Sequence, residues 1–140
     1  MLKIEIRQPA PYDESLLLST FLKSLRNQKP YRFIDTNVFY SFGHCFAKTM
    51  LSNVDIVIAH DPTDDTEIYG WAAYRGNTLY WIYVKHVFRN AYVGTQLMEH
   101  CFADFRIKPV KCAIWTSAIA YLESKWMLEF DTYELVRIIK

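Results

Sequence analysis

The sequence lacks several features that would place a protein in a large class by composition alone. Its formal net charge is only +1, so the basic stripe expected of a dedicated nucleic-acid binder is missing. No run of apolar residues is long enough to cross a bilayer, and the opening residues MLKIEIRQP lack the pattern of a signal peptide. We therefore expect a cytoplasmic protein whose partners are neither membranes nor nucleic acids.

Cysteine is also scarce. Cys45, Cys101 and Cys112 are odd in number and widely spaced, which favours free thiols in a reducing compartment over disulfides. Neither His44-Cys45 nor His100-Cys101 can chelate an ion as a unit, because adjacent residues on a helix point about 100° apart. The C-x2-C spacing of zinc sites is missing as well. The sequence therefore predicts no metal site.

The 140 residues suit one folded domain that spans positions 1–140. Apolar residues make up 51% of the chain and charged residues 22%, which excludes a disordered protein, and no linker or repeat interrupts the pattern. Aromatic residues make up 16%, enough to fill a thick core or to line a cleft. Trp71, Trp81, Tyr83 and Trp115 are the candidates for such a cleft, although aromatic strand residues more often belong to the core.

The periodicity of apolar residues predicts alternating strands and helices. Strands are expected where apolar residues alternate or form short runs, over 2–7, 54–59, 67–75, 79–84, 110–115 and 133–139. Helical spacing predicts helices over 13–27, from 35 or 36 to about 50, from 93 onward and over 118–128. Asp13 is the expected N-cap of the first helix, and Gly43 marks close packing or a bend in the second.

The stretch Leu79–Phe102 combines a strand, a short basic turn and a helix. The strand pattern ends near Val84, the turn carries Arg89, and the helix begins at about Val93. The first turn of a helix presents free N–H groups, and its dipole favours an anion. This arrangement is therefore suited to holding a pyrophosphate, although Arg89 and Gly94 are also compatible with a purely structural turn.

Val84, Arg89 and Gly94 have the spacing of the coenzyme A motif of the GNAT superfamily of N-acetyltransferases, which this stretch resembles. The family motif runs from a strand valine to Arg or Gln five residues later, then x-x-Gly-x-Gly/Ala. Tyr92 occupies the first glycine position of that motif, which is a departure from the family. The segment 125–131 also resembles small GNAT-like proteins carried by tailed phages.

The resemblance covers the whole chain and implies an α/β fold. In that fold a mixed, mostly antiparallel sheet contains a β-α-β cofactor-binding crossover, with helices on both faces. It also implies acetyl-CoA as co-substrate and direct transfer of the acetyl group to an amine, on a small molecule or a protein. The alternative is a catalytically lapsed GNAT-fold protein that acts as a protein-binding module. A homodimer is compatible with either function.

The resemblance also implies roles for individual residues. The backbone at Val84 would pair with the pantetheine arm of the cofactor. The pyrophosphate would be held by Arg89, Tyr92, Val93, Gly94 and Thr95, mainly through backbone amides. Ser117 occupies the position of a family asparagine near the cofactor, and Tyr121 substitutes for the family tyrosine that acts as general acid, unless it is a half-buried packing residue. Glu67 and His86 are the candidate general bases, with solvated surface residues as the alternative.

Overall fold

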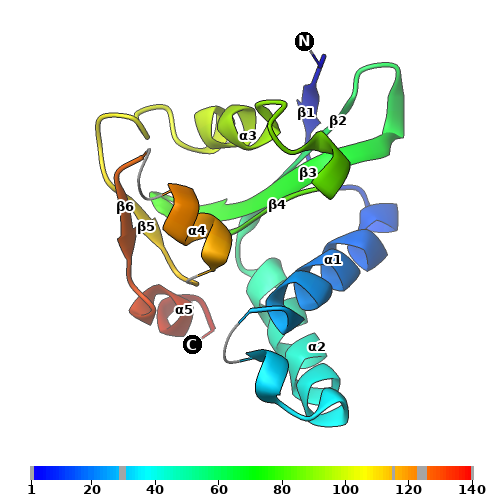
Figure 1. The fold of residues 1–140 in the computed structure, drawn as a ribbon, viewed down its shortest axis with the longest axis vertical. Helices are drawn as coiled ribbons and strands as arrows, with labels where there is room; N and C mark the ends of the chain where they lie inside the picture. Colours follow the sequence, from blue (N-terminus) through cyan, green and yellow to red (C-terminus); the bar gives the residue numbers. More distant parts are fainter. Residues whose placement is uncertain (1, 29–30, 115, 123–125, 140) are drawn as a thin grey trace.

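The computed structural model describes residues 2–28, 31–114, 116–122 and 126–139, and in this part of the chain six strands form one sheet. The strands follow one another across the sheet in chain order (Figure 1). Neighbours are antiparallel from β1 to β4 and parallel from β4 to β6. The strands are β1 (Glu5–Arg7), β2 (Asp55–Asp61), β3 (Asp64–Arg75), β4 (Thr78–Val84), β5 (Val110–Cys112) and β6 (Leu128–Phe130).

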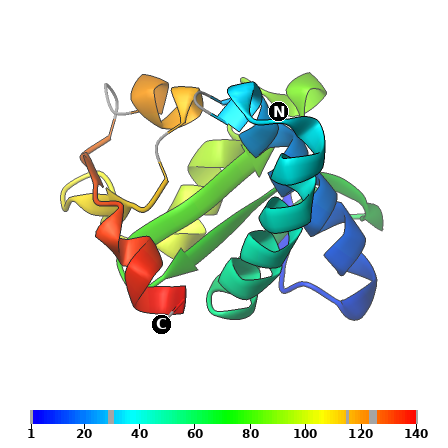
Figure 2. The ribbon, with the colours of Figure 1, turned by 90° about the horizontal axis from the view of Figure 1, so that it is seen from below.

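Helices cover both faces of the sheet, which confirms the predicted fold class (Figures 1 and 2). One face carries α1 (Glu14–Arg26), α2 (Thr36–Ser52) and α5 (Tyr133–Ile139). The other face carries α3 (Val93–Cys101) and α4 (Ser117–Leu122). None of the described helices has both the length and the apolar character that crossing a membrane requires.

The sheet separates two hydrophobic cores. Below α1, the ring of Phe21 meets Trp81 edge-on at 4.7 Å, and Trp71 is fully buried beside them. Below α3, Leu97 and Met98 are fully buried against the opposite face of the sheet. Because successive strand residues point to opposite faces, β2, β3 and β4 contribute side chains to both cores.

Asp35 and Gly43 shape α2 largely as the sequence predicts. The Asp35 carboxylate accepts hydrogen bonds from the amides of Asn37 and Val38, at 3.1 and 3.3 Å, and so caps the helix that begins at Thr36. A Cβ added to Gly43 would lie 3.2 Å from Cδ2 of Leu22, so this glycine allows close packing of α2 on α1.

Asp13 occupies the N-cap position of α1, as predicted, but its side chain makes no capping hydrogen bond to that helix. Its buried carboxylate forms an ion pair with Arg7 at 2.7 Å and accepts a hydrogen bond from the amide of Ala10. A charge-assisted pair between two elements binds the carboxylate more strongly than a helix amide does, so the side chain ties β1 to the start of α1. β1 is also shorter than predicted, since it begins at Glu5.

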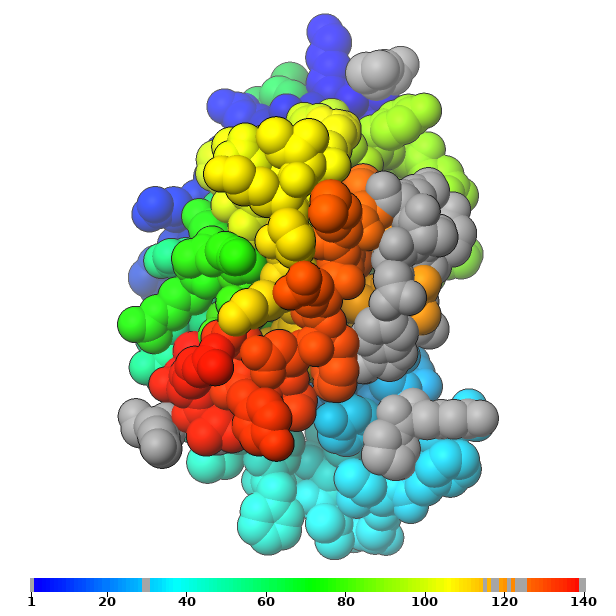
Figure 3. Space-filling model, turned by 90° about the vertical axis from the view of Figure 1, so that its left-hand side faces the viewer, coloured from blue at the N-terminus to red at the C-terminus, as the bar shows by residue number. Residues whose placement is uncertain are grey.

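The C-terminal segment corrects two predictions. Of the helix expected over 118–128, the structure describes α4 over Ser117–Leu122, and residues 123–125 lie outside its described part. Leu128 belongs instead to β6, the last strand of the sheet, whose side of the molecule faces the viewer in Figure 3. The strand expected over 133–139 is the helix α5. Asp131 accepts a hydrogen bond from the amide of Tyr133 at the start of this helix, and Ile138 is buried in the core on the α1 side of the sheet.

Candidate functional site

The middle of the sheet opens between β4 and β5. The two parallel strands pair at Thr78 and Leu79, and the last bond runs from the Ala113 amide to the Leu79 carbonyl at 3.0 Å. Among the described residues, no strand pairs with β4 on this side beyond Leu79. The stretch from Tyr80 to Val84 therefore presents a free strand edge, which is available to pair with an extended ligand.

A β-bulge lies where the strands separate. Tyr74 of β3 pairs with Leu79, whereas the preceding Ala73 pairs with Trp81, so Tyr80 is an extra residue in β4. As a result the side chains of Tyr80 and Trp81 both belong to the core on the α1 side. Bulges bend a strand and often lie beside functional sites, and this one coincides with the start of the opening.

The backbone groups of β4 beyond the bulge have a defined direction. The Lys85 amide donates to the Tyr69 carbonyl across to β3 at 2.9 Å. Because successive residues of a strand alternate in direction, the polar groups of Ile82 and Val84 point away from β3, toward the opening. Nε of Arg89 donates to the Val84 carbonyl at 3.3 Å, which places the arginine beside the end of this free edge.

The turn after β4 adopts a left-handed backbone at two residues. Asn90 has φ of 68° and Tyr92 has φ of 64°. The first bond within α3 runs from the Gln96 amide to the Tyr92 carbonyl, so the three amides of 93–95 have no acceptor within the helix. Tyr92 thus keeps the backbone conformation that a glycine would supply, and its side chain is 64% exposed rather than folded into the turn.

Arg89 and Gly94 flank these amides. Arg89 is exposed and, within the described residues, takes part in no ion pair. A Cβ on Gly94 would lie 3.9 Å from Cγ2 of Val84 and 4.0 Å from Cδ1 of Ile82, which are ordinary contact distances. Packing therefore does not require glycine at position 94.

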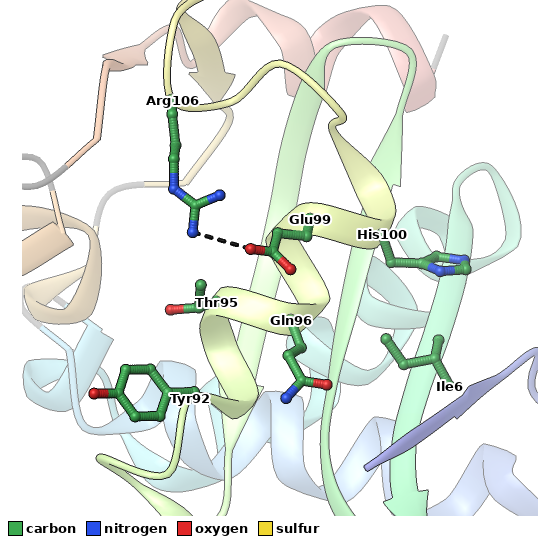
Figure 4. A pocket seen from close by; sticks show the side chains of 7 residues that line it. All are labelled: Ile6, Tyr92, Thr95, Gln96, Glu99, His100 and Arg106. Carbon is green, nitrogen blue, oxygen red and sulfur yellow. Dashed lines mark ion pairs between the residues drawn. The ribbon is translucent and has the colours of Figure 1, made fainter. Parts of the chain in front are cut away.

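A surface hollow of about 570 Å³ follows the exposed side of α3 rather than the opening between the strands (Figure 4). Thr95, Gln96, Glu99 and His100 of α3 line it, together with Tyr92 just before the helix and Ile6 of β1. Tyr92, Thr95 and Glu99 project to one side of the helix, and Ile6 and His100 lie on the other. Arg106 reaches toward them from the segment after α3 and forms an ion pair with Glu99 at 2.9 Å. Arg106 and Glu99 were not among the residues predicted from the sequence. The spacing of 92, 95 and 99 along one helix side was an available signal.

The predicted acid and its neighbour lie on α4. Tyr121 and Ser117 belong to this helix, but their side chains lie outside the part of the chain that is described, so both roles stay predictions. Thr116 is buried and caps α4 by accepting a hydrogen bond from the Ile119 amide at 3.1 Å. Glu67 and His86 are both exposed, on β3 and on the short 3-10 helix His86–Phe88.

The aromatic candidates for a cleft differ in their environments. Trp71 is a core residue whose indole N–H donates to Oγ1 of Thr20 at 2.9 Å. The indole N–H of Trp81 is buried and has no hydrogen-bond partner among the described residues, and Tyr83 is half-buried on the same face. Trp115 lies outside the described residues.

Within the described ranges, no three His, Cys, Asp or Glu side chains gather in a way that would hold a metal ion. Burial raises the pKa of the Cys101 thiol to about 12, so this residue is an unreactive part of the α3 helix.

No protein-family model matches the chain, and no curated protein gives a significant match to its sequence. Solved structures match its fold. A protein described as histone acetyltransferase HPA2 and related acetyltransferase, from Corynebacterium glutamicum ATCC 13032, matches 73% of this chain with a TM-score of 0.57 and 13% identity. The apo form of YjaB from Escherichia coli matches 73% with a TM-score of 0.55 and 17% identity. A GCN5-related N-acetyltransferase from Rhodopseudomonas palustris, also described as aminotransferase class II, matches 71% with a TM-score of 0.50 and 19% identity.

The matched region spans 71%, 66% and 64% of these three proteins, in the same order, so it is slightly less than two thirds of the last two. At this level of identity the likeness concerns the fold. The chain has the GNAT fold, as its motif resemblance predicts.

Proposed function

We propose that this GNAT-fold protein is an acyl-CoA-dependent N-acetyltransferase that transfers an acetyl group to an amine by direct attack. The observation that carries the proposal is the continuity of two features on one strand. The free edge of β4 begins after Leu79, and the same strand leads into the turn whose helix amides have no intrahelical acceptor. An extended arm with an anionic end fits this arrangement.

The residues present suit such a ligand. The polar backbone groups of Ile82 and Val84 point toward the opening and would pair with the amides of a pantetheine arm. The amides of 93–95 and the exposed guanidinium of Arg89 would hold the pyrophosphate. Acetyl-CoA would supply the activated acyl group as a thioester. The binding energy would come mostly from backbone dipoles that need no rearrangement on binding.

For the transfer itself, the protein must position the amine, accept a proton from it and supply a proton to the departing sulfur. The amine nitrogen bonds to the thioester carbon, the carbon–sulfur bond breaks, and the departing sulfur takes a proton. We assign that proton to the hydroxyl of Tyr121 on α4, which follows the strand opposite the free edge. An ordered water would remove the proton of the amine, since Glu67 and His86 are both exposed. We propose that the acceptor is an amine on a small molecule or on a protein.

The lapsed binding module is the second candidate, and one observation favours it. The segment before α2 and the first turns of that helix expose several large apolar side chains, with Phe33 of the segment 71% exposed and Phe42 of the helix 73% exposed. Exposed apolar groups close together often mark a protein interface. A module of this kind would bind a protein partner without consuming acetyl-CoA.

Calorimetric titration with acetyl-CoA tests the enzyme proposal. Wild-type protein should release heat and gain thermal stability, whereas Arg89→Ala should bind about tenfold more weakly with an unchanged melting temperature. Arg75→Ala is the matched control, because Arg75 lies in the hairpin at the opposite end of β3. Release of free coenzyme A thiol in the presence of a panel of amines then distinguishes turnover from binding. Absence of binding by the wild type would exclude the acyl-CoA proposal.

A further inference from the structure

Tyr92 occupies an unfavourable backbone conformation, and its side chain is not buried in the core to compensate for the strain. Its φ of 64° lies in the region that favours glycine and asparagine, yet the residue is a tyrosine. Its ring is 64% exposed and, in the part of the chain that is described, contacts no other aromatic ring. Core stability therefore does not account for an aromatic side chain here, whereas a flat ligand that covers the ring would.

Arg106 supplies a positive charge on the same side of α3 as Tyr92. Cζ of its guanidinium lies 4.6 Å from the ring centre of the buried Phe105, a cation–π contact that helps to position the charged end of the side chain. Its partner Glu99 is 49% exposed and the arginine side chain 58% exposed. An ion pair so open to solvent contributes little, so a phosphate group can replace the carboxylate at small cost.

The two ends of the proposed cofactor must leave the turn in opposite directions. The pantetheine arm enters the opening along β4, so the nucleotide end has to pass outward over the exposed side of the α3 N-terminus. Tyr92 and Thr95 line the hollow at that place, and Arg106 closes its far side (Figure 4). The hollow continues past Gln96 and His100 to Ile6, and its whole volume of about 570 Å³ lies within the range of ligand-binding sites.

We propose that this hollow binds the nucleotide end of the cofactor, with the ring of Tyr92 stacked on the adenine base and Arg106 paired with the 3′-phosphate. The inference rests on the proposed function, because it assigns a further subsite to the same ligand. It makes Tyr92 and Arg106 residues that select a nucleotide-bearing acyl donor over the bare acyl-phosphopantetheine. The tyrosine that replaces the family glycine at position 92 would then contribute to binding the nucleotide.

The stacking is tested with a pair of variants and a pair of probes. Tyr92→Phe keeps the ring, whereas Tyr92→Asn removes it and still tolerates the left-handed backbone. With acetyl-CoA, Tyr92→Phe should bind like the wild type and Tyr92→Asn about tenfold more weakly. With S-acetyl-4′-phosphopantetheine, which lacks the nucleotide, all three proteins should bind alike. Equal affinity of Tyr92→Asn and wild type for acetyl-CoA would overturn the stacking.

The phosphate contact is tested with coenzyme A and 3′-dephospho-coenzyme A. Arg106→Gln should weaken binding of coenzyme A about fivefold and leave the dephosphorylated probe unaffected. Glu99→Gln should strengthen coenzyme A binding, because it frees Arg106 and removes a negative charge beside the phosphate. An equal effect of Arg106→Gln on both probes would overturn this assignment. Failure of the wild type to bind any of the four probes would instead contradict the proposed function itself.

Discussion

Nε of Arg89 donates to the carbonyl oxygen of Val84 at 3.3 Å, five residues back along the chain. This bond joins Val84, at the end of the free strand edge, to Arg89 in the turn before α3. The guanidinium has five donors in a rigid fork, and only Nε is used by this bond. Its two outer nitrogens remain available to an anion, so one hydrogen bond within the protein both orients the arginine and leaves its binding groups free.

A substitution at Gly94 is expected to affect the stability of the fold and the binding of a ligand in opposite directions. A Cβ at this position meets only ordinary contacts, and alanine is the better helix former, so Gly94→Ala should raise the free energy of unfolding by up to ~1 kcal/mol. The same methyl group hinders close approach of phosphate to the amides, so affinity for acetyl-CoA should fall at least tenfold. Chemical denaturation and calorimetry on one variant measure both effects. A loss of stability with unchanged affinity would show that the glycine is structural.

Gly70 has the opposite character, because it lies where two backbones nearly touch. A Cβ there would lie 2.4 Å from the Tyr83 carbonyl oxygen, closer than real Cβ atoms approach. Gly70→Ala should therefore push β3 from β4 and lower the free energy of unfolding by about 2–3 kcal/mol. Denaturant unfolding measures the loss. Gly76→Ala is not a suitable control, because φ of Gly76 is 59° and an alanine there would be strained for a different reason. An unchanged midpoint would mean that the strands separate at this point without cost.

The central part of the fold was predictable because its sequence signals are local and agree with one another. Alternation over 79–84 and helical spacing after Val93 identify the strand and helix on either side of the turn, and both are present. The left-handed conformation of Tyr92 was not predictable, because no propensity favours tyrosine there. The use of the backbone at Val84 to pair with an extended ligand was expected from the family resemblance, whereas a role for the residues along the exposed side of α3 was not.

The C-terminal error has a specific cause. Residues 133–139 alternate well enough to indicate a strand, yet they form α5. The sequence does contain a helix-start signal, since Asp131 is followed three residues later by Glu134. This short helix is held partly by a distant residue, because the buried Glu134 pairs with Lys111 of β5 at 3.4 Å in addition to its local pair with Arg137. A pattern over seven residues cannot reveal a partner 23 positions away.

Asp13 predicts a dependence of stability on pH. The hydrogen bonds from Arg7 lower the pKa of its carboxyl, and burial opposes them less strongly. A pKa lower in the folded state means that the stabilisation is present above about pH 4 and is lost as the pH falls through the folded value. Asp13→Asn should cost about 2–3 kcal/mol at pH 7, and the difference from wild type should shrink below pH 4.

The control for Asp13 is Asp104→Asn. Asp104 forms an exposed pair with Lys108 at 3.5 Å, and exposed pairs contribute little, so this variant should stay within about 0.5 kcal/mol of wild type. Urea unfolding at several pH values measures both variants. A cost for Asp13→Asn that is the same at pH 3 and pH 7 would contradict the buried ion pair as its cause.

Trp71 and Trp81 provide a matched test of a buried donor with and without a partner. Both indoles are buried in the same core, and replacing either with phenylalanine removes a similar volume. Trp71→Phe also breaks the bond to Thr20, whereas Trp81→Phe removes an N–H that has no partner among the described residues. Because an unsatisfied buried donor is itself costly, its removal offsets part of the lost packing. Trp71→Phe should therefore lower the free energy of unfolding by about 1–2 kcal/mol more than Trp81→Phe. Denaturant unfolding of the two variants side by side measures this difference, and an equal or larger loss for Trp81→Phe would show that its indole N–H is satisfied within the fold.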